Sequence, residues 1–314
     1  MVESETEQRL QTTPAMPELP EVEVLRRQLR RALGDARLAD MRIYERRLRF
    51  PLSEGFADTA LTRDRRGTPR LEDIRRRGKY LLFHLSGGRV LLCHLGMSGQ
   101  LLLEDSSQLE PRRHCHEHLA FLFRRRDRRG GSRTRTVRLG FRDTRRFGFW
   151  DIARADELSE HPRLRGLGME PFDAGFGGSF LVGAFAGRRV SVKSALLDQR
   201  IVAGVGNIYA SEALFRARIS PMVCAGDLTA RRCGRLAAGI VSVLEDAIAA
   251  GGSTRRDYVH SDGGGGYFQH RWSVYGREGE PCPGCRCRLA ETGGIQKSLQ
   301  SGRSTFYCPA RQRR

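Results

Sequence analysis

The sequence predicts an α+β chain of several domains: an antiparallel β domain with one leading helix, then a helical domain, then a short hairpin that contains cysteines. Three observations lead to this prediction. Short apolar runs separated by turn residues fill the first part of the chain, apolar residues at helical spacing follow, and four of the eight cysteines lie at or beyond residue 282. A length of 314 residues is enough for about two ordinary domains.

A helix is expected shortly after Met16. Pro20 suits its first turn and Gly34 suits its end. Residues 1–16 are polar and acidic and lack an apolar period, so they are expected to be a disordered leader or a mis-assigned start. The apolar residues of the helix recur at helical spacing: Val22, Leu25, Leu29 and Leu33.

Antiparallel strands are expected after this helix. Two apolar runs, 80–85 and 90–95, flank a Gly-Gly pair of the kind found in tight hairpins. The Arg-, Gly- and Ser-rich stretch 124–135 predicts an exposed basic loop, which would add phosphate affinity without sequence information. Further strand-like runs lie at 43–44, 119–123, 137–141 and 147–152.

The second half of the chain has helical periods. Helices are expected over 195–200 and 208–216, and an apolar stripe at 236–248 predicts a third. Before them, residues 166–175 are expected to form a hinge. The expected domains are therefore 17–165 for the β domain, 176–271 for the helical domain and 272–314 for the hairpin.

The composition narrows the class of partner. Lys and Arg number 55 against 36 Asp and Glu, which gives a net charge of +19. Such a charge favours a polyanion, either nucleic acid or an anionic membrane surface. No apolar run approaches the roughly 18 residues of a membrane span, and the first residues lack the apolar core of a secretion signal. We therefore expect a cytoplasmic, nucleic-acid-binding protein without a membrane partner.

Lysine is scarce in this basic chain. Only Lys79, Lys193 and Lys297 are present among 55 basic residues. A lysine is retained where an amine must lose its proton, although chance retention explains three lysines nearly as well. Lys79 follows an Arg-Arg-Arg-Gly run and enters a strand, so it is a candidate for a phosphate-lined site.

The glycine turn at 204–207 opens a predicted helix. Free backbone N–H groups and the helix dipole favour a phosphate there, and Asn207 adds a side-chain donor. A plain turn between two helices is the other interpretation. The positive charge of the chain shifts the balance toward phosphate.

Cysteines near the C-terminus form an incomplete zinc motif. Cys282 and Cys285 make one CxxC knuckle, and Cys308 begins a second. The fourth position of the motif is Arg311, which cannot ligate zinc because its guanidinium stays protonated. One zinc ion is expected on Cys282, Cys285 and Cys308, with Cys287 as a tentative replacement ligand. The alternatives are a finger that folds without metal and a damaged finger.

Histidines alternate at 114, 116 and 118. On a strand this spacing would place all three on one face, where they could hold a metal. Polar surface histidines, or histidines facing DNA, are the alternative interpretations.

The segment 16–23 carries the strongest chemical signal. If translation begins at Met16, removal of the methionine leaves Pro17 as the N-terminus. Its secondary amine would have a lower pKa than a lysine and could attack an electrophilic sugar carbon. Glu18 would lie beside it as an acid.

These residues resemble the bacterial formamidopyrimidine-DNA glycosylase family, bifunctional base-excision enzymes for oxidised purines. The resemblance runs from Pro17 to about Gln312. It rests on residues 17–23 (PELPEVE), 78–81 (GKYL), 94–99 (HLGMSG), 143–148 (DTRRFG), 204–212 (GVGNIYASE) and 302–308 (GRSTFYC).

The resemblance implies an N-terminal β-sandwich, a helix-two-turns-helix domain and a C-terminal zinc finger, with damaged double-stranded DNA as the partner and a monomeric enzyme. The damaged nucleotide would be flipped out of the duplex. Pro17 would form a Schiff base and Glu18 would donate a proton that opens the sugar ring. Lys79 would serve in β-elimination and Arg303 in δ-elimination.

The resemblance also implies the DNA contacts. Met97, Arg145 and Phe147 would fill the hole left in the stack, with Arg145 facing the orphaned cytosine. The Gly-rich loop 253–267 would close over the extruded base, or else be a slack linker. Phosphate contacts are expected from His116, Arg188, Asn207 and Arg303.

The chain departs from this family at its start. With residues 1–16 attached, Pro17 is an internal amide without a nucleophilic nitrogen. We therefore expect the leader to be absent or removed from the active protein. The alternative functions are a glycosylase for oxidised pyrimidines and a lesion-binding protein without catalysis. A zinc-ribbon transcription factor fits the charge and the cysteines but leaves the segment 16–23 unexplained.

Overall fold

The computed structural model describes residues 16–53, 56, 67–106, 113–126, 134–253, 267–285 and 288–313. Several expectations lie outside them: those for the leader 1–15, for the middle of the basic loop 124–135, for nearly all of the loop 253–267, and for Cys287. No helix within the described ranges is both long enough and apolar enough to span a membrane.

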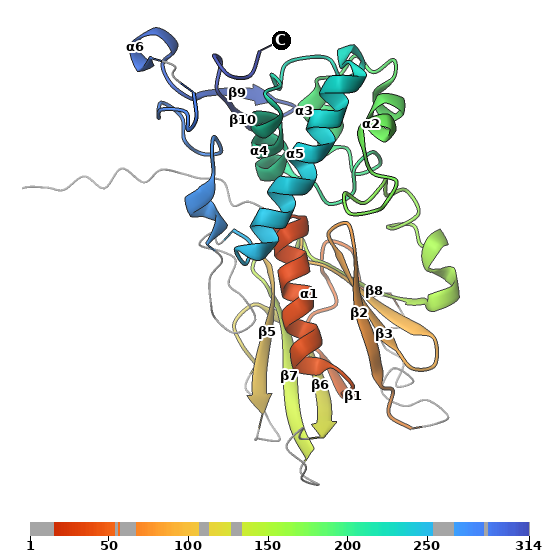
Figure 1. The fold of residues 1–314 in the computed structure, drawn as a ribbon. Coiled ribbons are helices and arrows are strands. Elements are labelled where there is room, and N and C mark those ends of the chain that lie inside the picture. Colours follow the sequence, from red (N-terminus) through yellow and green to blue (C-terminus); the bar gives the residue numbers. More distant parts are fainter. Residues whose placement is uncertain are drawn as a thin grey trace, which may run out of the picture.

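The first part of the described chain forms two antiparallel four-stranded sheets (Figure 1). One sheet has the order β1-β6-β7-β5 and the other β2-β3-β4-β8. Their inner faces share one apolar core, in which Trp150 packs against the rings of Phe83, Phe121 and Phe141. The strands are β1 Arg37–Ile43, β2 Leu71–Arg77, β3 Tyr80–Leu85, β4 Arg89–His94, β5 Gly99–Ser106, β6 Glu117–Arg126, β7 Thr134–Asp143 and β8 Phe149–Arg154.

Helix α1 (Leu19–Leu33) belongs to two cores. Its residues Leu25, Leu29 and Leu33 are buried in the core of the two sheets. Leu19, at its first turn, is instead buried among the helices of the second part of the chain. In Figure 1 the helix runs along the sheets and its upper end lies beside the lower end of α5. The helix therefore joins the two parts of the molecule.

The second part of the chain is helical, as expected. Helices α4 and α5 pack together, and the apolar stripe of α5 is buried, including Leu236, Ile240 and Leu244. The α-helices are α2 Gly178–Phe185, α3 Val192–Leu197, α4 Asn207–Ala217, α5 Ala230–Ala249 and α6 Leu289–Thr292. Short 3₁₀ helices are η3 Ala155–Glu160, η4 Ala225–Asp227 and η5 Phe268–Arg271.

The C-terminal hairpin packs on these helices. Strands β9 (Gln296–Gln300) and β10 (Arg303–Tyr307) are antiparallel, and Phe306 and Cys308 are buried in the helical core. The carboxylate of Glu212 on α4 accepts three backbone N–H bonds of 2.9 Å from residues 273–275. This contact fixes the chain that leads into the hairpin.

Some elements differ from the sequence predictions. Strands β2 and β5 were not predicted, because only Leu71 and Ile74 of β2 are buried and β5 begins at a glycine. Strand β8 begins at Phe149, since Phe147 lies in the preceding loop. Helix α3 begins and ends three residues earlier than predicted because Ser191 caps it through the backbone N–H of Ser194. Helix α2 was missed.

Candidate active site

The carboxylate of Glu18 lies on the N-terminus of α4. Its Oε1 accepts the backbone N–H of Ile208 at 2.9 Å and its Oε2 accepts that of Tyr209 at 3.4 Å. The Glu18 side chain is buried, and burial raises its pKa against the opposing effects of the Lys79 charge and these N–H donors. The side chain is thereby disposed to carry a proton, beside the buried residue Pro17.

The glycine turn is shaped around this contact. A Cβ on Gly206 would lie 2.3 Å from the Glu18 carboxyl carbon, and one on Gly204 would lie 2.6 Å from Leu19. Gly204 also has a φ of +91°, which favours glycine. The N–H groups of Ile208 and Tyr209 are therefore not available to a phosphate, because Glu18 already accepts them. The phosphate contact of Asn207 stays a prediction.

A second buried carboxyl, that of Glu21, lies one helical turn further on. Its Oε1 accepts the Tyr209 hydroxyl at 2.6 Å and the backbone N–H of Ser253 at 2.9 Å, and its Oε2 accepts the N–H of Glu18 at 3.0 Å. Burial raises the pKa of Glu21 to about 7, against the hydrogen bond from Tyr209. Glu21 was not predicted as a site residue, although its place three residues after Glu18 matches a capping-box position.

Lys79 lies in the two-residue turn between β2 and β3, and its side chain is buried. Burial lowers its pKa, the charge of Glu18 opposes this, and the charge of Arg303 lowers the pKa further. A lowered pKa is what an amine requires to act as a base near neutral pH. The structure thus brings Glu18, Lys79 and Arg303 within electrostatic range of one another.

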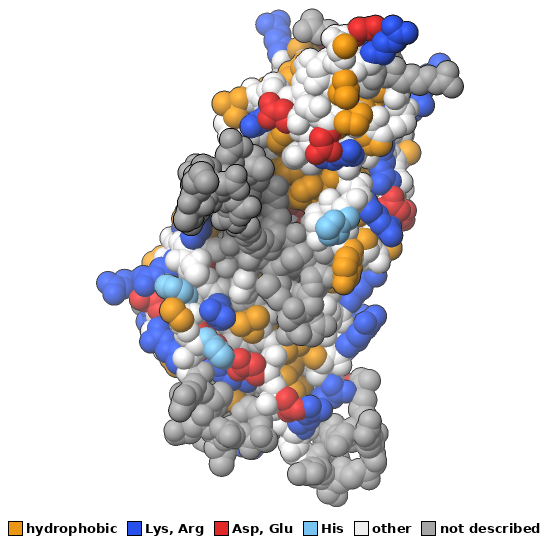
Figure 2. Space-filling view, turned by 90° about the vertical axis from the view of Figure 1, so that its left-hand side faces the viewer, with side chains coloured by type: hydrophobic (Ala, Val, Ile, Leu, Met, Phe, Trp, Pro, Cys, Tyr) orange, Lys and Arg blue, Asp and Glu red, His pale blue; other side chains and the backbone are white. Residues whose placement is uncertain are grey.

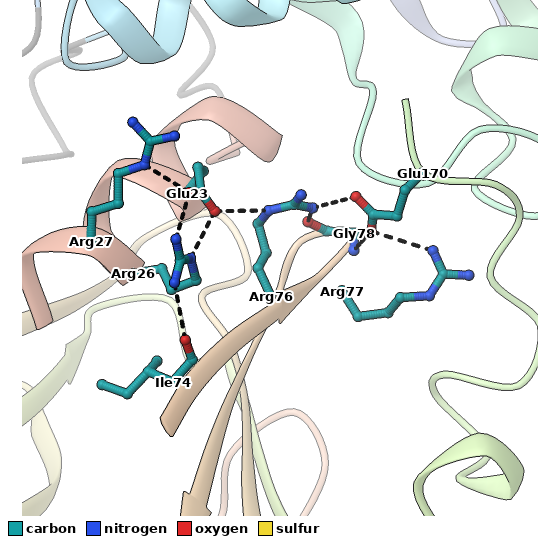
Figure 3. A network of polar contacts seen from close by, with 8 residues as sticks. All are labelled: Glu23, Arg26, Arg27, Ile74, Arg76, Arg77, Gly78 and Glu170. Carbon is teal, nitrogen blue, oxygen red and sulfur yellow. Dashed lines mark hydrogen bonds and ion pairs between the residues drawn. The ribbon is translucent and has the colours of Figure 1, made fainter. Parts of the chain in front are cut away.

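An ion network holds the turn that carries Lys79 (Figure 3). Glu170, from the segment that links the two parts of the chain, accepts the backbone N–H of Gly78 at 2.5 Å. The same carboxylate accepts Arg76 at 2.7 Å and Arg77 at 3.3 Å. Arg76 also pairs with Glu23 of α1 at 3.3 Å. The network therefore ties α1, β2 and the linking segment to the residue before Lys79.

A second buried amine, Lys193, approaches the same site from α3. Its Nζ donates to the Ser304 carbonyl at 2.9 Å and to the Thr305 hydroxyl at 2.8 Å, next to Arg303. Burial lowers the pKa of Lys193 to about 7, against the charge of Glu18. The amide of Asn207 also donates to the Ser304 carbonyl, at 2.9 Å. Lysine scarcity was the only sequence signal for Lys193.

The three side chains that were expected to fill the gap in the DNA stack, Met97, Arg145 and Phe147, lie on neighbouring loops of the sheets. Met97 is half-buried in the turn between β4 and β5. Arg145 is exposed between β7 and β8, and its guanidinium lies 4.7 Å from the ring centre of Phe147. Arg188, which follows α2, is exposed as well.

The histidines do not share one strand face. His114 and His116 lie in the turn before β6, where His116 has a φ of +59°. His118, on β6, is buried, and its Nε2 bonds the Asp143 carbonyl at 2.7 Å. The metal interpretation of this trio is therefore wrong, because the turn removes the alternation on which it depended. His116 itself is exposed.

Cys282, Cys285 and Cys308 come together at the hairpin. Their sulfur atoms all lie within 4.8 Å of one another, close enough to hold one metal ion. Arg311, at the position of the fourth ligand, donates to the Gly284 carbonyl at 2.5 Å, and its guanidinium lies 4.8 Å from the ring centre of Phe215. The donors thus fit a metal through three thiolates, while Arg311 bonds the knuckle itself.

Basic side chains lie on both parts of the face that Figure 2 shows. Figure 2 shows Lys and Arg side chains on both the upper, helical part and the lower, sheet part of one face. A polyanion lying along the molecule would meet positive charge on each part.

Comparison with known proteins agrees with this arrangement. Residues 16–150 match the family profile of the formamidopyrimidine-DNA glycosylase N-terminal domain, and residues 167–259 match that of the formamidopyrimidine-DNA glycosylase H2TH domain. The relative from Rhodospirillum centenum is 48% identical over 304 residues, which cover 95% of this chain and 100% of the relative. The relative from Chelativorans sp. is 44% identical over 313 residues, with the same coverage. Both are named formamidopyrimidine-DNA glycosylase.

Solved structures show the same fold. MutM (Fpg) from Thermus thermophilus is 38% identical, with a TM-score of 0.76 over 94% of this chain and 98% of that chain. Lactococcus lactis Fpg in complex with DNA that contains an abasic site is 29% identical, with a TM-score of 0.78 over 95% and 100%. The same Lactococcus protein has also been solved with DNA that contains an oxidised pyrimidine.

An Fpg-type N-terminal domain followed by an H2TH domain defines the class of this protein. The chain belongs to the formamidopyrimidine-DNA glycosylase family.

The contact between Glu170 and the Arg76–Gly78 segment can be tested by substitution. We expect Glu170→Gln to lower the free energy of unfolding by about 1–3 kcal/mol, because Arg76, Arg77 and the Gly78 N–H lose a charged partner. Arg76 keeps its pair with Glu23, and Arg77 keeps two carbonyl acceptors. The measurement is urea unfolding followed by intrinsic fluorescence. Glu157→Gln is the control. Glu157 and its partner Arg154 are both exposed, so this substitution should leave the unfolding midpoint unchanged. Equal midpoints for both variants would contradict the prediction.

Glu21 is expected to make stability depend on pH. Its folded pKa of about 7 lies above the ordinary value of 4.5, so the folded chain holds this proton more tightly than the unfolded chain. The resulting stabilisation is complete below about pH 4.5 and is lost as the pH rises through 7, by about 3 kcal/mol in total. Thermal unfolding of Glu21→Gln between pH 5 and pH 8 should therefore show a flatter pH dependence than the parent. Parallel curves would rule this out.

Proposed function

We propose that this chain excises oxidised purines from duplex DNA in base-excision repair, with the Pro17 nitrogen as nucleophile. As a member of its family it is a DNA glycosylase with AP lyase activity. One observation carries the proposal: a buried carboxyl with a raised pKa, Glu18, is held beside Pro17 on the N-terminus of α4. Damaged double-stranded DNA is the proposed partner of a monomeric enzyme that acts at the bacterial nucleoid.

The first step is attack on the sugar of a flipped nucleotide, which cannot be reached inside the stack. The Pro17 nitrogen adds to the anomeric carbon, the damaged base leaves, and a Schiff base forms. This requires Pro17 to be the first residue, because a proline nitrogen within a peptide bond has no lone pair available for attack. Glu18 supplies the proton that opens the sugar ring, and its raised pKa keeps that proton available.

Strand cleavage then requires bases near the Schiff base. Lys79 is the proposed base for β-elimination, because its buried amine has a lowered pKa. Arg303 is proposed to act in δ-elimination on the other side of the lesion. The lowered pKa of Lys79 comes in part from the charge of Arg303, which supports a shared site for the two steps.

The loops of the sheets are proposed to hold the opened duplex. Met97, Arg145 and Phe147 would fill the space that the flipped nucleotide leaves, with Arg145 facing the orphaned cytosine. Their partial or full exposure on two neighbouring loops supports this role. The proposed phosphate contacts are His116, Arg188, Asn207 and Arg303.

One zinc ion is the proposed metal of the hairpin. Cys282, Cys285 and Cys308 would hold it, with Cys287 as a tentative fourth ligand. Bound there, zinc would crosslink the two ends of the hairpin and take no part in the chemistry. A hairpin crosslinked in this way would hold Arg303, on β10, near Lys79.

Oxidised pyrimidines are a second candidate substrate class. Lactococcus lactis Fpg has been solved with DNA that contains an oxidised pyrimidine. We propose such lesions as additional substrates of the same chemistry rather than as a separate activity.

The nucleophile can be tested by borohydride trapping. Protein that begins at Pro17 should form a covalent adduct with an 8-oxoguanine:cytosine duplex, because borohydride reduces the Schiff base. Protein that keeps residues 1–16, verified by intact mass, should form none. With Gly in place of Pro17, trapping should slow by at least about tenfold, because a primary amine replaces the secondary one.

Two outcomes would contradict the proposal. A fully trapped chain that still carries residues 1–16 would exclude Pro17 as the nucleophile. Tight duplex binding without any trapping by the protein that begins at Pro17 would indicate a lesion-binding protein without catalysis.

The metal site can be tested by changing its fourth position. Arg311→Cys should tighten zinc binding by at least about tenfold, because a fourth thiolate completes a tetrahedral site. The measurement is competition with a coloured chelator, together with the thiolate-to-metal absorption of the cobalt-substituted protein. Cys308→Ser should weaken binding in the same assay. If Cys287→Ser weakens binding as much as Cys308→Ser does, then Cys287 is the fourth ligand and three-thiolate binding is wrong.

A further inference from the structure

Two loops of the sheets form one packed unit. The first, residues 95–98, joins β4 to β5, and the second, residues 144–148, joins β7 to β8. They are separated by more than forty positions in the sequence, yet each carries part of the proposed set that fills the gap in the duplex. Met97 lies on the first loop, and Arg145 and Phe147 lie on the second.

The backbones of the two loops touch. A Cβ on Gly96 would lie 2.4 Å from the carbonyl carbon of Phe147 and 2.7 Å from the nitrogen of Gly148. Gly96 also has a φ of +63°, so a side chain there would be strained as well as obstructed. A movement of one loop would therefore displace the other.

One carboxylate, that of Asp143 at the end of β7, joins both loops. Its Oδ1 accepts the Ser98 hydroxyl at 2.5 Å from the first loop and the Arg145 backbone N–H at 3.3 Å from the second. Its Oδ2 accepts the Gly148 backbone N–H at 2.6 Å. The Asp143 side chain is fully buried, so these donors take the place of water.

The backbone of Asp143 reaches a third DNA-facing segment. Its N–H donates to the His116 carbonyl at 3.0 Å, and its own carbonyl bonds the ring of His118 at 2.7 Å. His116 is thereby fixed in its left-handed turn next to the two loops. A single residue thus links the segments that carry Met97, His116, Arg145 and Phe147.

We propose that Asp143 is a positioning residue, which sets the two loops as one unit so that Met97, Arg145 and Phe147 reach the opened base pair together. This rests on the proposed function of those three side chains. Asn at this position would have one oxygen and one NH₂ group. In either orientation of the amide, its NH₂ group would face a backbone N–H of the second loop, that of Gly148 or that of Arg145. The loops would then lose their common anchor while the cluster of Glu18 and Lys79 keeps its own contacts.

The experiment compares Asp143→Asn with the parent, both beginning at Pro17, on two substrates. One is a duplex with 8-oxoguanine opposite cytosine or adenine, and the other is a single-stranded oligonucleotide with an abasic site, which needs no opening of a base pair. We expect kcat/KM on the cytosine duplex to fall by at least about tenfold, and the preference for cytosine over adenine to shrink. Cleavage of the single strand should stay within about twofold of the parent. Ser98→Ala removes only the hydroxyl bond to Asp143, so its kcat/KM on the cytosine duplex should lie between those of the parent and Asp143→Asn.

Asp105→Asn is the matched control, because Asp105 is an exposed carboxylate on β5 whose ion-pair partner is Arg135. It should leave both substrates unaffected. An equal loss of activity of Asp143→Asn on both substrates would show a general structural role and overturn the proposal. No loss of activity on either substrate would also overturn it. Thermal unfolding of each variant identifies a folding defect.

Binding distinguishes failure of this inference from failure of the proposed function. The probe is a duplex with a stable abasic analogue opposite cytosine or adenine, which needs no catalysis. Asp143→Asn should bind the cytosine duplex at least about tenfold more weakly than the parent and lose its preference for cytosine. If the parent neither cleaves nor traps DNA, the proposed function fails, and this binding result still decides the role of Asp143. Unchanged binding with unchanged preference would overturn it.

Discussion

The contact between the Glu18 carboxylate and the N-terminus of α4 is the constraint on which the rest of the site depends. A buried carboxyl is costly unless donors replace its water, and the N–H groups of Ile208 and Tyr209 do so here. The helix end also contributes a favourable dipole. This contact places the residue before α1 against the helical part of the chain, so the two halves must be assembled before the acid and the amines can meet.

The parts of the fold that could be predicted from sequence are those whose signal is local. The leading helix, the hairpin around Gly87-Gly88 and the long helix α5 follow from apolar spacing and turn residues. Site residues in uninterrupted motifs were also accessible, because Pro17 and Glu18 are adjacent and Cys282 and Cys285 form a knuckle. The resemblance to a known family then supplied the connections between motifs, and the family comparison confirmed it.

The rest of the site depends on partners far apart in the sequence. Glu170 bonds Gly78 across 92 positions, and Lys193 bonds Ser304 across 111 positions. Neither pairing leaves a local pattern in the sequence. The glycine turn at 204–207 shows the same limit. Its helix end was correctly located, but the carboxylate of Glu18, far away in the sequence, accepts two of the helix N–H groups. Alternation misled at His114 and His116, because a left-handed residue places them in a turn.

The division of α1 between two cores has a consequence for the separability of the domains. Leu19 is buried among the helices, while Leu25, Leu29 and Leu33 are buried between the sheets. A cut within the segment that links the two parts would leave α1 whole in the N-terminal fragment. If the fragments then separated, Leu19 and the helical-core residues that cover it would be exposed to water. The two fragments should therefore remain associated after such a cut. Helix α1 is thus shared by the two apolar cores of the described chain.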